Sequence, residues 1–347
     1  MRPPTLRDVA RGAGVHPATA SRALNPGTRA LVNAETVSRV MQVAESLGYR
    51  PNPIARSLKT SRSGTIGVVI PDLTNPLFPP IIRGIEDVLG PAGFNAWMVN
   101  TDNDPAREES LIDSLRSRQV EGLIVATARL EHPLLHRLRA EGVRTVLVNR
   151  RTHDDAIASV TADDATGVAA AVTHLKGLGH RRIAHLAGPQ DTSTGTDRRE
   201  GFVRALHDAG LDDDARLVVP TEWWSEHEGA RALRELLDSG LEFTAVIAGN
   251  DLLALGCYDV FEERGISCPG DLSVVGFNDM PFIDKLRPPL TSVRVPHYEL
   301  GAEAARMLLA GIEDPQAAQE SVLLPVTLIQ RHSSAPPRSG GPRRGQH

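Results

Sequence analysis

Apolar residues repeat at helical spacing through the first fifty positions of the chain. Three short runs place apolar side chains three or four residues apart, which is the period of an amphipathic helix. Each run begins at a residue suited to cap a helix, and the three spans are Thr5 (with Asp8 as its capping-box partner) to Gly14, His16 to Leu24, and Asn33 to Gly48. Pro17 suits the first turn of the second helix. Three short helices with a tight turn between the first two predict a helix-turn-helix domain.

From Thr65 onward the pattern changes to short apolar runs that alternate with helical stretches. Nine runs indicate strands: IGVVIP, FNAWMVN, GLIVA, TVLVN, SVTAD, IAHLAG, LVVP, AVIAGN and LSVVGF. This alternation is typical of parallel sheets covered by helices on both faces, so an α/β body is predicted behind the all-α N-terminal domain. Ligands bind such sheets at the carboxyl ends of the strands. The residues just after each run are therefore candidates for a binding site.

The charge of the chain divides near the same place as its pattern. The first 62 residues hold ten Lys and Arg against three Asp and Glu, a balance of +7, although the whole chain carries −5. The remainder therefore carries −12. A basic segment on an acidic body is expected when one part docks on phosphates and the other stays away from them. Double-stranded DNA is the predicted partner of the basic segment.

Length and hydropathy bear on the number of domains and on the expected location of the protein in the cell. Its 347 residues are enough for two or three compact units, and a hydrophobic content of 41% is ordinary for a globular protein. No run approaches the roughly 18 consecutive apolar residues of a membrane span. The N-terminal MRPPTLRDVARGAG also lacks the apolar stretch of a secretory signal. The expected location is the cytoplasm, with no membrane partner.

Motifs for catalysis and metal binding are missing from the sequence. It contains no P-loop, no dinucleotide-binding glycine fingerprint, no H-E-x-x-H and no G-x-S-x-G. His174, His180 and His185 are spaced at six and five residues, which does not place all three on one helical face. Cys257 and Cys268 are too few for a disulfide framework and lack zinc-site spacing, so buried free thiols are expected. The sequence predicts no enzyme, no cofactor and no metal.

The segments TLRDVARGAGVHPATASRALN and LGYRPNPIARSLKT closely resemble the LacI/GalR family of bacterial repressors. In that family the second helix lies in the major groove, and the resemblance implies that Arg22 contacts a base edge. A guanidinium can bond guanine bidentately, although contact with phosphate alone is the open alternative. The implied DNA contacts of this domain are Pro17, Ala18 and Arg22 at bases, Thr19, Ser21 and Asn25 near phosphates, and also Thr5 and Leu6.

The same resemblance implies a second DNA element after the three helices. Asn52 and Pro53 suit the start of a helix, and IARSLK supplies about two turns, a length that is marginal in water without a partner. We expect a hinge that folds on DNA. In the family a leucine from each of two hinges wedges into a minor-groove step, and the matching residue is Leu58. The implied hinge contacts are Asn52, Ala55, Leu58 and Lys59.

The body resembles periplasmic sugar-binding proteins, which have two lobes joined by three crossovers. The resemblance covers about residues 4–332, and we place the crossovers near Thr161, Ser292 and Val322. The expected parts are a helix-turn-helix domain at 1–51, a hinge helix and linker at 52–63, an effector-binding and dimerisation domain at 64–332 and a disordered tail at 333–347. Within the third part, lobe 1 is expected at about 64–161 plus 293–321 and lobe 2 at about 162–292 plus 322–332.

The family pattern also implies which residues line the cleft between the lobes. They are Leu77, Phe78 and Asn149 on one wall and Arg198, Trp224, Asn250 and Asn278 on the other. Aromatic rings, an arginine and amides suit a sugar, because its ring faces stack on aromatics while its hydroxyls need donors and acceptors. Many family members carry an aspartate where this chain has Asn278. For single residues, an ordinary turn asparagine or a core tryptophan stays an alternative.

Two segments are expected to be solvated. The tail SSAPPRSGGPRRGQH has no heptad pattern and predicts disorder, which favours a dimer over a tetramer. The aspartate runs at 154–155, 163–164 and 212–214 lie in loop-like sequence and are expected in turns that face water.

Together these features predict a homodimeric, cytoplasmic transcription regulator. The resemblance implies a repressor that binds operator DNA, is nucleoid-associated when bound, and responds allosterically to a small molecule, expected to be a sugar or sugar derivative. Two other classes stay open. A solute-binding protein for a transporter fits the body alone, and a sugar-active enzyme with a regulatory domain would need a catalytic pair that the sequence does not show.

Overall fold

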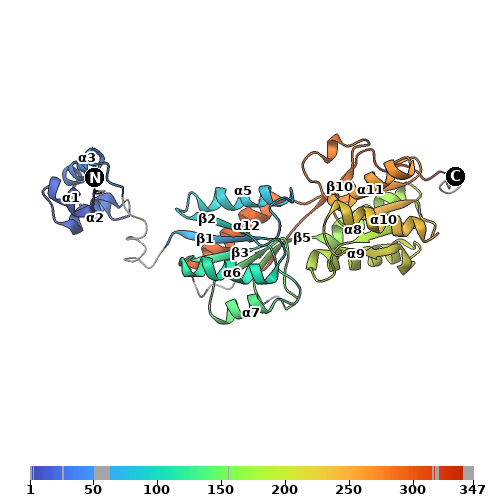
Figure 1. Cartoon of the computed structure of the whole chain (residues 1–347), viewed down its shortest axis with the longest axis horizontal. Helices are drawn as coiled ribbons and strands as arrows, with labels where there is room; N and C mark the ends of the chain where they lie inside the picture. Colours follow the sequence, from blue (N-terminus) through green and yellow to red (C-terminus); the bar gives the residue numbers. More distant parts are fainter. Residues whose placement is uncertain are drawn as a thin grey trace. The chain divides into compact units, whose positions relative to one another are not determined.

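A computed structural model gives the fold, and it describes residues 2, 4–25, 27–50, 63–154, 156–314, 316 and 320–338. The chain forms two compact units, which we name the headpiece (Met1–Gly64) and the body (Thr65–His347). Each unit has its own hydrophobic core. Figure 1 shows the small helical headpiece and the α/β body as separate parts of the chain.

The headpiece contains the three predicted helices with the predicted caps. They are α1 (Leu6–Gly12), α2 (Pro17–Leu24) and α3 (Ala34–Ser46), with a short 3-10 helix η1 (Arg29–Leu31) before α3. The His16 Nδ1 accepts a hydrogen bond from the Ala18 amide, and the Asn33 Oδ1 accepts one from the Thr36 amide at 2.7 Å. Gly14 and Gly48 both have φ +64, so they end α1 and α3 in the left-handed region that favours glycine.

The headpiece core is small and built from short side chains. Val9, Ala20 and Val40, one from each helix, are completely buried and belong to one cluster. Alanines at the contacts allow the helices to approach closely. The remaining faces of the helices are therefore free to carry polar and basic side chains.

The body contains two six-stranded sheets, and each sheet defines one lobe (Figure 1). Lobe 1 has the strand order β11-β5-β4-β3-β1-β2, with β1 (Thr65–Ile70), β2 (Asn95–Asn100), β3 (Gly122–Val125), β4 (Thr145–Val148), β5 (Ser159–Ala162) and β11 (Val322–Leu324). Lobe 2 has the order β12-β10-β9-β8-β6-β7, with β6 (Ile183–Ala187), β7 (Val218–Pro220), β8 (Ala245–Ala248), β9 (Ser273–Asn278), β10 (Thr291–Arg294) and β12 (Thr327–Ile329). Adjacent strands are parallel except at β10 and β12. All nine predicted strands are confirmed, whereas β10, β11 and β12 were not predicted.

Helices cover the sheets of both lobes, as expected for parallel strands. Lobe 1 carries α5 (Phe78–Leu89), α6 (Pro105–Ser117), α7 (Pro133–Ala140) and α12 (His297–Glu313). Lobe 2 carries α8 (Asp164–Gly177), α9 (Ser193–Ala209), α10 (Glu226–Asp238) and α11 (Asp251–Arg264), together with the 3-10 helices η2 (Ala215–Leu217) and η3 (Ile283–Lys285). None of the helices in the described ranges combines the length and apolar character that a bilayer crossing requires.

The three crossovers between the lobes lie two to four residues later than predicted. The chain crosses after β5, after β10 and between β11 and β12. Residues 322–324, assigned to lobe 2 from the sequence, pair with β5 in lobe 1. Residues 293–294, assigned to lobe 1, belong to β10 in lobe 2. The predicted lobe boundaries were wrong at β10 and β11 because the pattern did not reveal these two strands, each of which precedes a crossing.

The predicted disordered tail is wrong for residues 333–338. The buried Ser333 donates its hydroxyl to the Val274 carbonyl at 2.6 Å, and the Ala335 amide donates to the Ser273 Oγ at 3.1 Å. Both partners lie on β9, so this part of the tail is held against lobe 2. Residues 339–347 lie outside the described residues.

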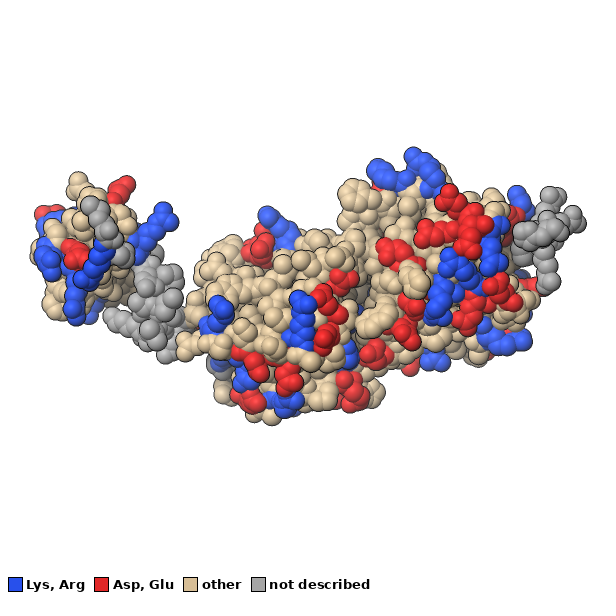
Figure 2. All heavy atoms as spheres, viewed as in Figure 1, with Lys and Arg blue, Asp and Glu red and all other residues tan. Residues whose placement is uncertain are grey.

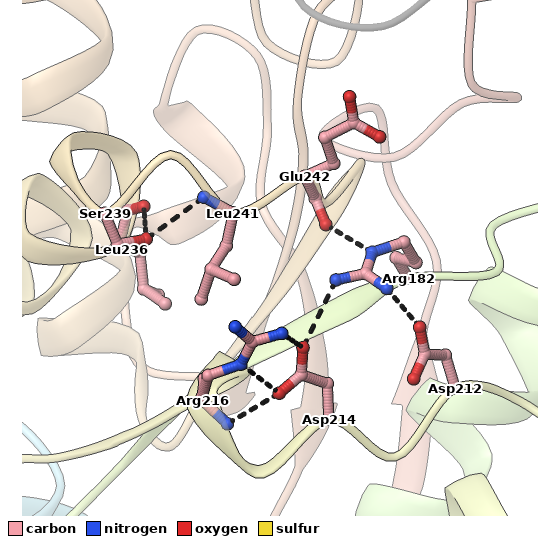
Figure 3. A network of polar contacts seen from close by, with 8 residues as sticks. All are labelled: Arg182, Asp212, Asp214, Arg216, Leu236, Ser239, Leu241 and Glu242. Carbon is pink, nitrogen blue, oxygen red and sulfur yellow. Dashed lines mark hydrogen bonds and ion pairs between the residues drawn. The ribbon is translucent and has the colours of Figure 1, made fainter.

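An exposed polar network joins three loops of lobe 2 (Figure 3). Arg182 donates to the Glu242 carbonyl at 2.6 Å and pairs with Asp212 and Asp214. Asp214 also pairs with Arg216 at 2.7 Å, and hydrogen bonds from Arg216 hold the pKa of that carboxyl well below its usual range. Arginines therefore fix both carboxylates. Asp212 is exposed, as predicted for this run, whereas Asp214 is partly buried and is not simply solvated.

Candidate functional site

The outward face of α2 presents the residues expected to meet DNA. Ala20 and Ala23 are buried, whereas Ala18 and Arg22 are exposed and the other candidates on this helix are half-buried. This burial follows from helical period, which turns position 22 away from the core that position 20 enters. Figure 2 shows several Lys and Arg side chains on the visible face of the headpiece. A guanidinium in this position is free to enter a groove.

The other headpiece candidates lie beside α2 or in front of α1. Thr5 donates its hydroxyl to Asp8 at 2.6 Å in the capping box, and Leu6 packs against the headpiece core. Asn25 follows α2 and accepts a hydrogen bond from the Gly27 amide. The four hinge candidates, Asn52, Ala55, Leu58 and Lys59, lie outside the described residues.

A cleft of about 1190 Å³ lies between the two lobes of the body. Residues of both lobes line it, and all seven predicted effector residues are among them: Leu77, Phe78, Asn149, Arg198, Trp224, Asn250 and Asn278. They come from segments as much as 201 positions apart in the chain, between Leu77 and Asn278. The structure therefore brings the predicted site together.

Strand ends and helix starts position these side chains. Asn149 follows β4 with φ +68, and Asn278 is the last residue of β9. Asn250 follows β8 and caps α11, because its Oδ1 accepts a hydrogen bond from the Leu253 amide at 2.8 Å. The alternative for Asn250 was a turn asparagine that bonds nearby backbone, and such a bond is present in the same side chain that lines the cleft.

Arg198 is the most constrained side chain of the cleft. Its Nε donates to the Asp164 Oδ1 at 3.0 Å, and its Nη1 donates to the Gly249 carbonyl at 2.7 Å. The guanidinium carbon lies 3.9 Å from the centre of the Phe277 ring and 5.5 Å from that of Trp224. A buried carboxylate and two aromatic rings therefore fix this arginine before any ligand arrives.

Asp164 is a functional residue that the sequence interpretation missed. It was expected in a solvated turn, but it is buried at the first position of α8 and pairs with Arg198. Burial raises the pKa of its carboxyl to about 6, although the neighbouring Arg198 acts in the opposite direction. The signal that could have found it is its place directly after β5, at the carboxyl end of a strand.

The two lobes also touch beside the cleft. The Arg151 amide of lobe 1 donates to the Ser193 Oγ of lobe 2 at 3.0 Å, and the Arg151 guanidinium pairs with Asp197 at 2.8 Å. The Leu130 amide donates to the Asp191 carbonyl at 2.9 Å. These contacts join the start of α9 to two loops of lobe 1.

No metal centre competes with this cleft in the described part of the chain. No group of three or more His, Cys, Asp or Glu is arranged there to hold a metal ion. His174, His180 and His185 each have a separate partner, namely Ser334, Thr244 and the Ile247 carbonyl. Cys257 is buried and Cys268 half-buried, and both are free thiols.

Comparisons with known proteins give the same division of the chain. Residues 5–52 match the model of bacterial regulatory proteins of the lacI family, and residues 172–334 match a periplasmic binding protein-like domain. The HTH-type transcriptional regulator RegA of Clostridium saccharobutylicum is 33% identical over 331 residues, which cover 95% of this chain and 99% of that protein. This chain belongs to the LacI family. The ribose operon repressor of Halalkalibacterium halodurans is 32% identical, over 95% of this chain and 97% of that protein.

Solved structures of LacI-family proteins share the whole architecture. A lac repressor dimer bound to operator and the anti-inducer ONPF matches with a TM-score of 0.86 at 28% identity, over 96% of this chain and 100% of that one. A complex of the transcriptional regulator CelR with cellobiose matches with a TM-score of 0.74 at 31% identity, over 95% and 99% of the two chains. The predicted fold class is confirmed.

Family membership also settles the class of function. The chain is a DNA-binding transcription regulator, as predicted, because full-length relatives of the LacI family are named as regulators and repressors. The two alternatives, a transporter's solute-binding protein and a sugar-active enzyme, are excluded because regulators match the headpiece and the body together, over 95% or more of the chain.

Proposed function

We propose that this LacI-family regulator is a homodimeric repressor whose cleft binds a sugar or sugar derivative and whose affinity for operator DNA changes when that effector binds. The observation that carries the proposal is the convergence of seven predicted residues on one cleft. An arginine, two aromatic side chains and three asparagines suit a polar ligand with apolar ring faces. Similarity to CelR in complex with cellobiose supports a carbohydrate ligand.

The DNA end of the proposal rests on the exposed face of α2. Arg22 would contact a base edge, Pro17 and Ala18 would contribute shape, and polar residues around them would meet phosphates. The other proposed contacts are Thr5, Leu6, Thr19, Ser21, Asn25 and the hinge residues Asn52, Ala55, Leu58 and Lys59. Two headpieces would occupy the two halves of a near-palindromic operator, as the two-fold symmetry of a dimer requires.

Coupling between cleft and headpiece would act through the lobes. Effector binding to both walls changes the lobe arrangement, and the arrangement of the two first lobes decides whether the hinges can meet and fold. A coupling free energy of about 1–3 kcal/mol is enough for a roughly 5- to 150-fold change in operator affinity. The protein would work in the cytoplasm and be nucleoid-associated when bound to operator.

A thermal-shift screen of the full chain against a sugar library tests the effector. A ligand that binds only the folded state raises the melting temperature, and raises it further as the ligand concentration exceeds the Kd. We expect one sugar to raise the melting temperature of the native protein but not that of Arg198→Ala. Arg234→Ala is the control, because Arg234 forms an exposed pair with Glu263 outside the cleft, and this variant should respond like the native protein. Unchanged binding by Arg198→Ala would overturn the assignment of the cleft.

The same effector then tests regulation. Fluorescence anisotropy of labelled promoter DNA, titrated with the protein in the presence and absence of the sugar, gives the sign of the coupling. Equal operator affinity under both conditions would contradict allosteric control.

A further inference from the structure

One arginine in the cleft lacks the partner that every other cleft arginine has. Arg150 follows Asn149 at the end of β4, lines the cleft and is only 7% exposed. Its Nε is buried without a hydrogen-bond partner, and among the described residues its side chain makes no ion pair. A buried guanidinium carries five donors, so leaving it unpaired is costly.

The other arginines that line the cleft are already neutralised by neighbouring acids. Arg129 lies 3.6 Å from Asp191, and its Nη2 also donates to the Asn103 carbonyl. Arg231 pairs with Glu228 at 2.9 Å. Arg198 pairs with Asp164, as described above. Arg150 is therefore the cleft cation whose counter-charge is missing.

Within the described ranges, no acid near Arg150 is placed to supply that charge. Asp191 and Glu108 raise its pKa only through longer-range attraction, and burial lowers the pKa to about 10. Glu108 accepts a hydrogen bond from the Thr127 hydroxyl and lies 3.6 Å from His132 Nε2. The Asp191 carboxylate pairs with Arg129 instead. Asp72 and Glu222 also line the cleft, but they form no pair with Arg150.

Two further features of the opposite wall are compatible with an anion. Helix α9 begins at Ser193, beside Arg151, so its N-terminus lies next to the segment that carries Arg150. The N-terminus of a 17-residue helix favours anions. Next to Arg198, this chain has Asn278, which brings no charge, and its Oδ1 lies 3.5 Å from the Arg198 Nη2. The Asn278 side chain itself therefore does not repel an anion.

We propose that the effector is an acidic sugar, and that its carboxylate or phosphate group binds the Arg150 guanidinium. This inference rests on the effector function proposed above and narrows its ligand class. The planar guanidinium matches two oxygens of either group, and pairing replaces the water that Arg150 loses on burial. Neutral sugars would leave the buried cation without a counter-charge.

The test compares acidic sugars with their neutral parents on the full chain. Glucuronate, galacturonate and gluconate form the carboxylate arm, glucose 6-phosphate and ribose 5-phosphate form the phosphate arm, and glucose, galactose and ribose are the neutral probes. We expect one arm to contain a ligand that binds about tenfold or more tightly than its neutral parent, as a charge-assisted pair allows. The arm that responds identifies the anionic group.

Variants assign the preference to Arg150. Arg150→Gln should remove the preference for the acidic sugar over its neutral parent, whereas Arg150→Lys, which keeps the charge, should retain part of that preference. Arg234→Gln, on the surface of lobe 2, is the matched control and should retain all of it. Without ligand, Arg150→Gln should melt at the same or a higher temperature, because a buried unpaired charge is removed.

Three results would overturn the inference. If a neutral sugar binds as tightly as its acid and its binding is unaffected by Arg150→Gln, the proposed sugar effector would stand, but the proposal that it carries an anionic group would be wrong. Absence of binding by every acidic and neutral sugar would overturn both. If the ligand-free Arg150→Gln protein melts well below the native protein, the guanidinium already stabilises the folded state without a ligand.

Discussion

Buried charges show how neighbouring residues acquire different roles. The sequence LVNRR places Arg150 and Arg151 side by side, yet Arg150 is buried without a partner and Arg151 is paired with Asp197. Asn149, just before them, was predicted in the cleft because it ends a strand. The pattern could not single out Arg150, since the charges that act on it come from residues far along the chain, such as Asp191 and Arg198. Position at a strand end is visible in sequence, whereas charge pairing across lobes is not.

Asp251 is a second buried charge with consequences for stability. Its Oδ1 accepts a hydrogen bond from the Ser292 hydroxyl at 2.6 Å and its Oδ2 accepts one from the Met280 amide at 2.8 Å. Burial raises the pKa of this carboxyl to about 7. Because the folded pKa is above the unfolded one, the stability that the neutral form contributes is present below about pH 4 and is lost as pH rises through 7.

Asp251→Asn should therefore gain stability relative to the native protein as pH rises. We expect the difference in the free energy of unfolding to change by about 2–4 kcal/mol in favour of the variant between pH 5 and pH 8. Urea unfolding at several pH values measures it. Taking the difference between the two proteins cancels the buried histidines His185 and His297, whose pKa values burial lowers to about 4. A pH-independent difference would contradict the prediction.

At the scale of elements, α5 and α12 of lobe 1 pack at unusually short range. A Cβ added at Gly84 of α5 would lie 2.0 Å from the Tyr298 carbonyl oxygen, and one added at Gly301 of α12 would lie 1.9 Å from the Ile81 carbonyl oxygen. The two glycines thus let the helix backbones meet directly. Any side chain at either position separates the helices.

Gly301→Ala should consequently destabilise the body by about 1–3 kcal/mol or more through overpacking. Gly177→Ala is the matched control, because this residue ends α8 and an added Cβ would meet nothing within 4 Å. The control should be neutral or stabilising by up to about 1 kcal/mol, as alanine is preferred over glycine in a helix. Circular dichroism during thermal unfolding compares the two. Equal melting temperatures would show that α5 and α12 can move apart at little cost.

Elements differ in how well the sequence predicts them. Long apolar strands such as β1 and β9 are recognisable because they are buried on both faces. The strands β11 and β12 have only three residues each, are partly exposed and are separated by two residues, although they belong to different sheets. Hydropathy reports burial but not which sheet a strand joins, so the crossovers were placed too early.

At the scale of the whole molecule, the chain separates recognition of DNA from recognition of the effector. The headpiece has its own core of small residues, and the cleft is formed by residues of the body alone. The basic charge of the first 62 residues and the acidic charge of the remainder follow the same division. Because these properties are distributed along the chain, they were predictable without knowledge of any contact.

A fragment that begins at Thr65 should therefore fold and retain the full thermal shift with the effector, but should lose operator binding altogether. Anisotropy with operator DNA and thermal melting of the fragment provide the two measurements. The fragment keeps both sheets and every residue named in the cleft. Its failure to fold, or loss of the ligand-induced shift, would show that the headpiece supports the body.

The contacts of Arg151 with Ser193 and Asp197 join the two lobes and so restrict their relative movement. They fasten the start of α9 to lobe 1 on one rim of the cleft, in addition to the three crossing segments. Moving the lobes straight apart would break this ion pair, so we expect them to rotate about an axis near these contacts instead. A rotation of a few degrees about that axis would displace most the part of lobe 1 that lies farthest from it. A ligand that closes the opposite rim of the cleft would therefore turn a small local movement into a larger distant one.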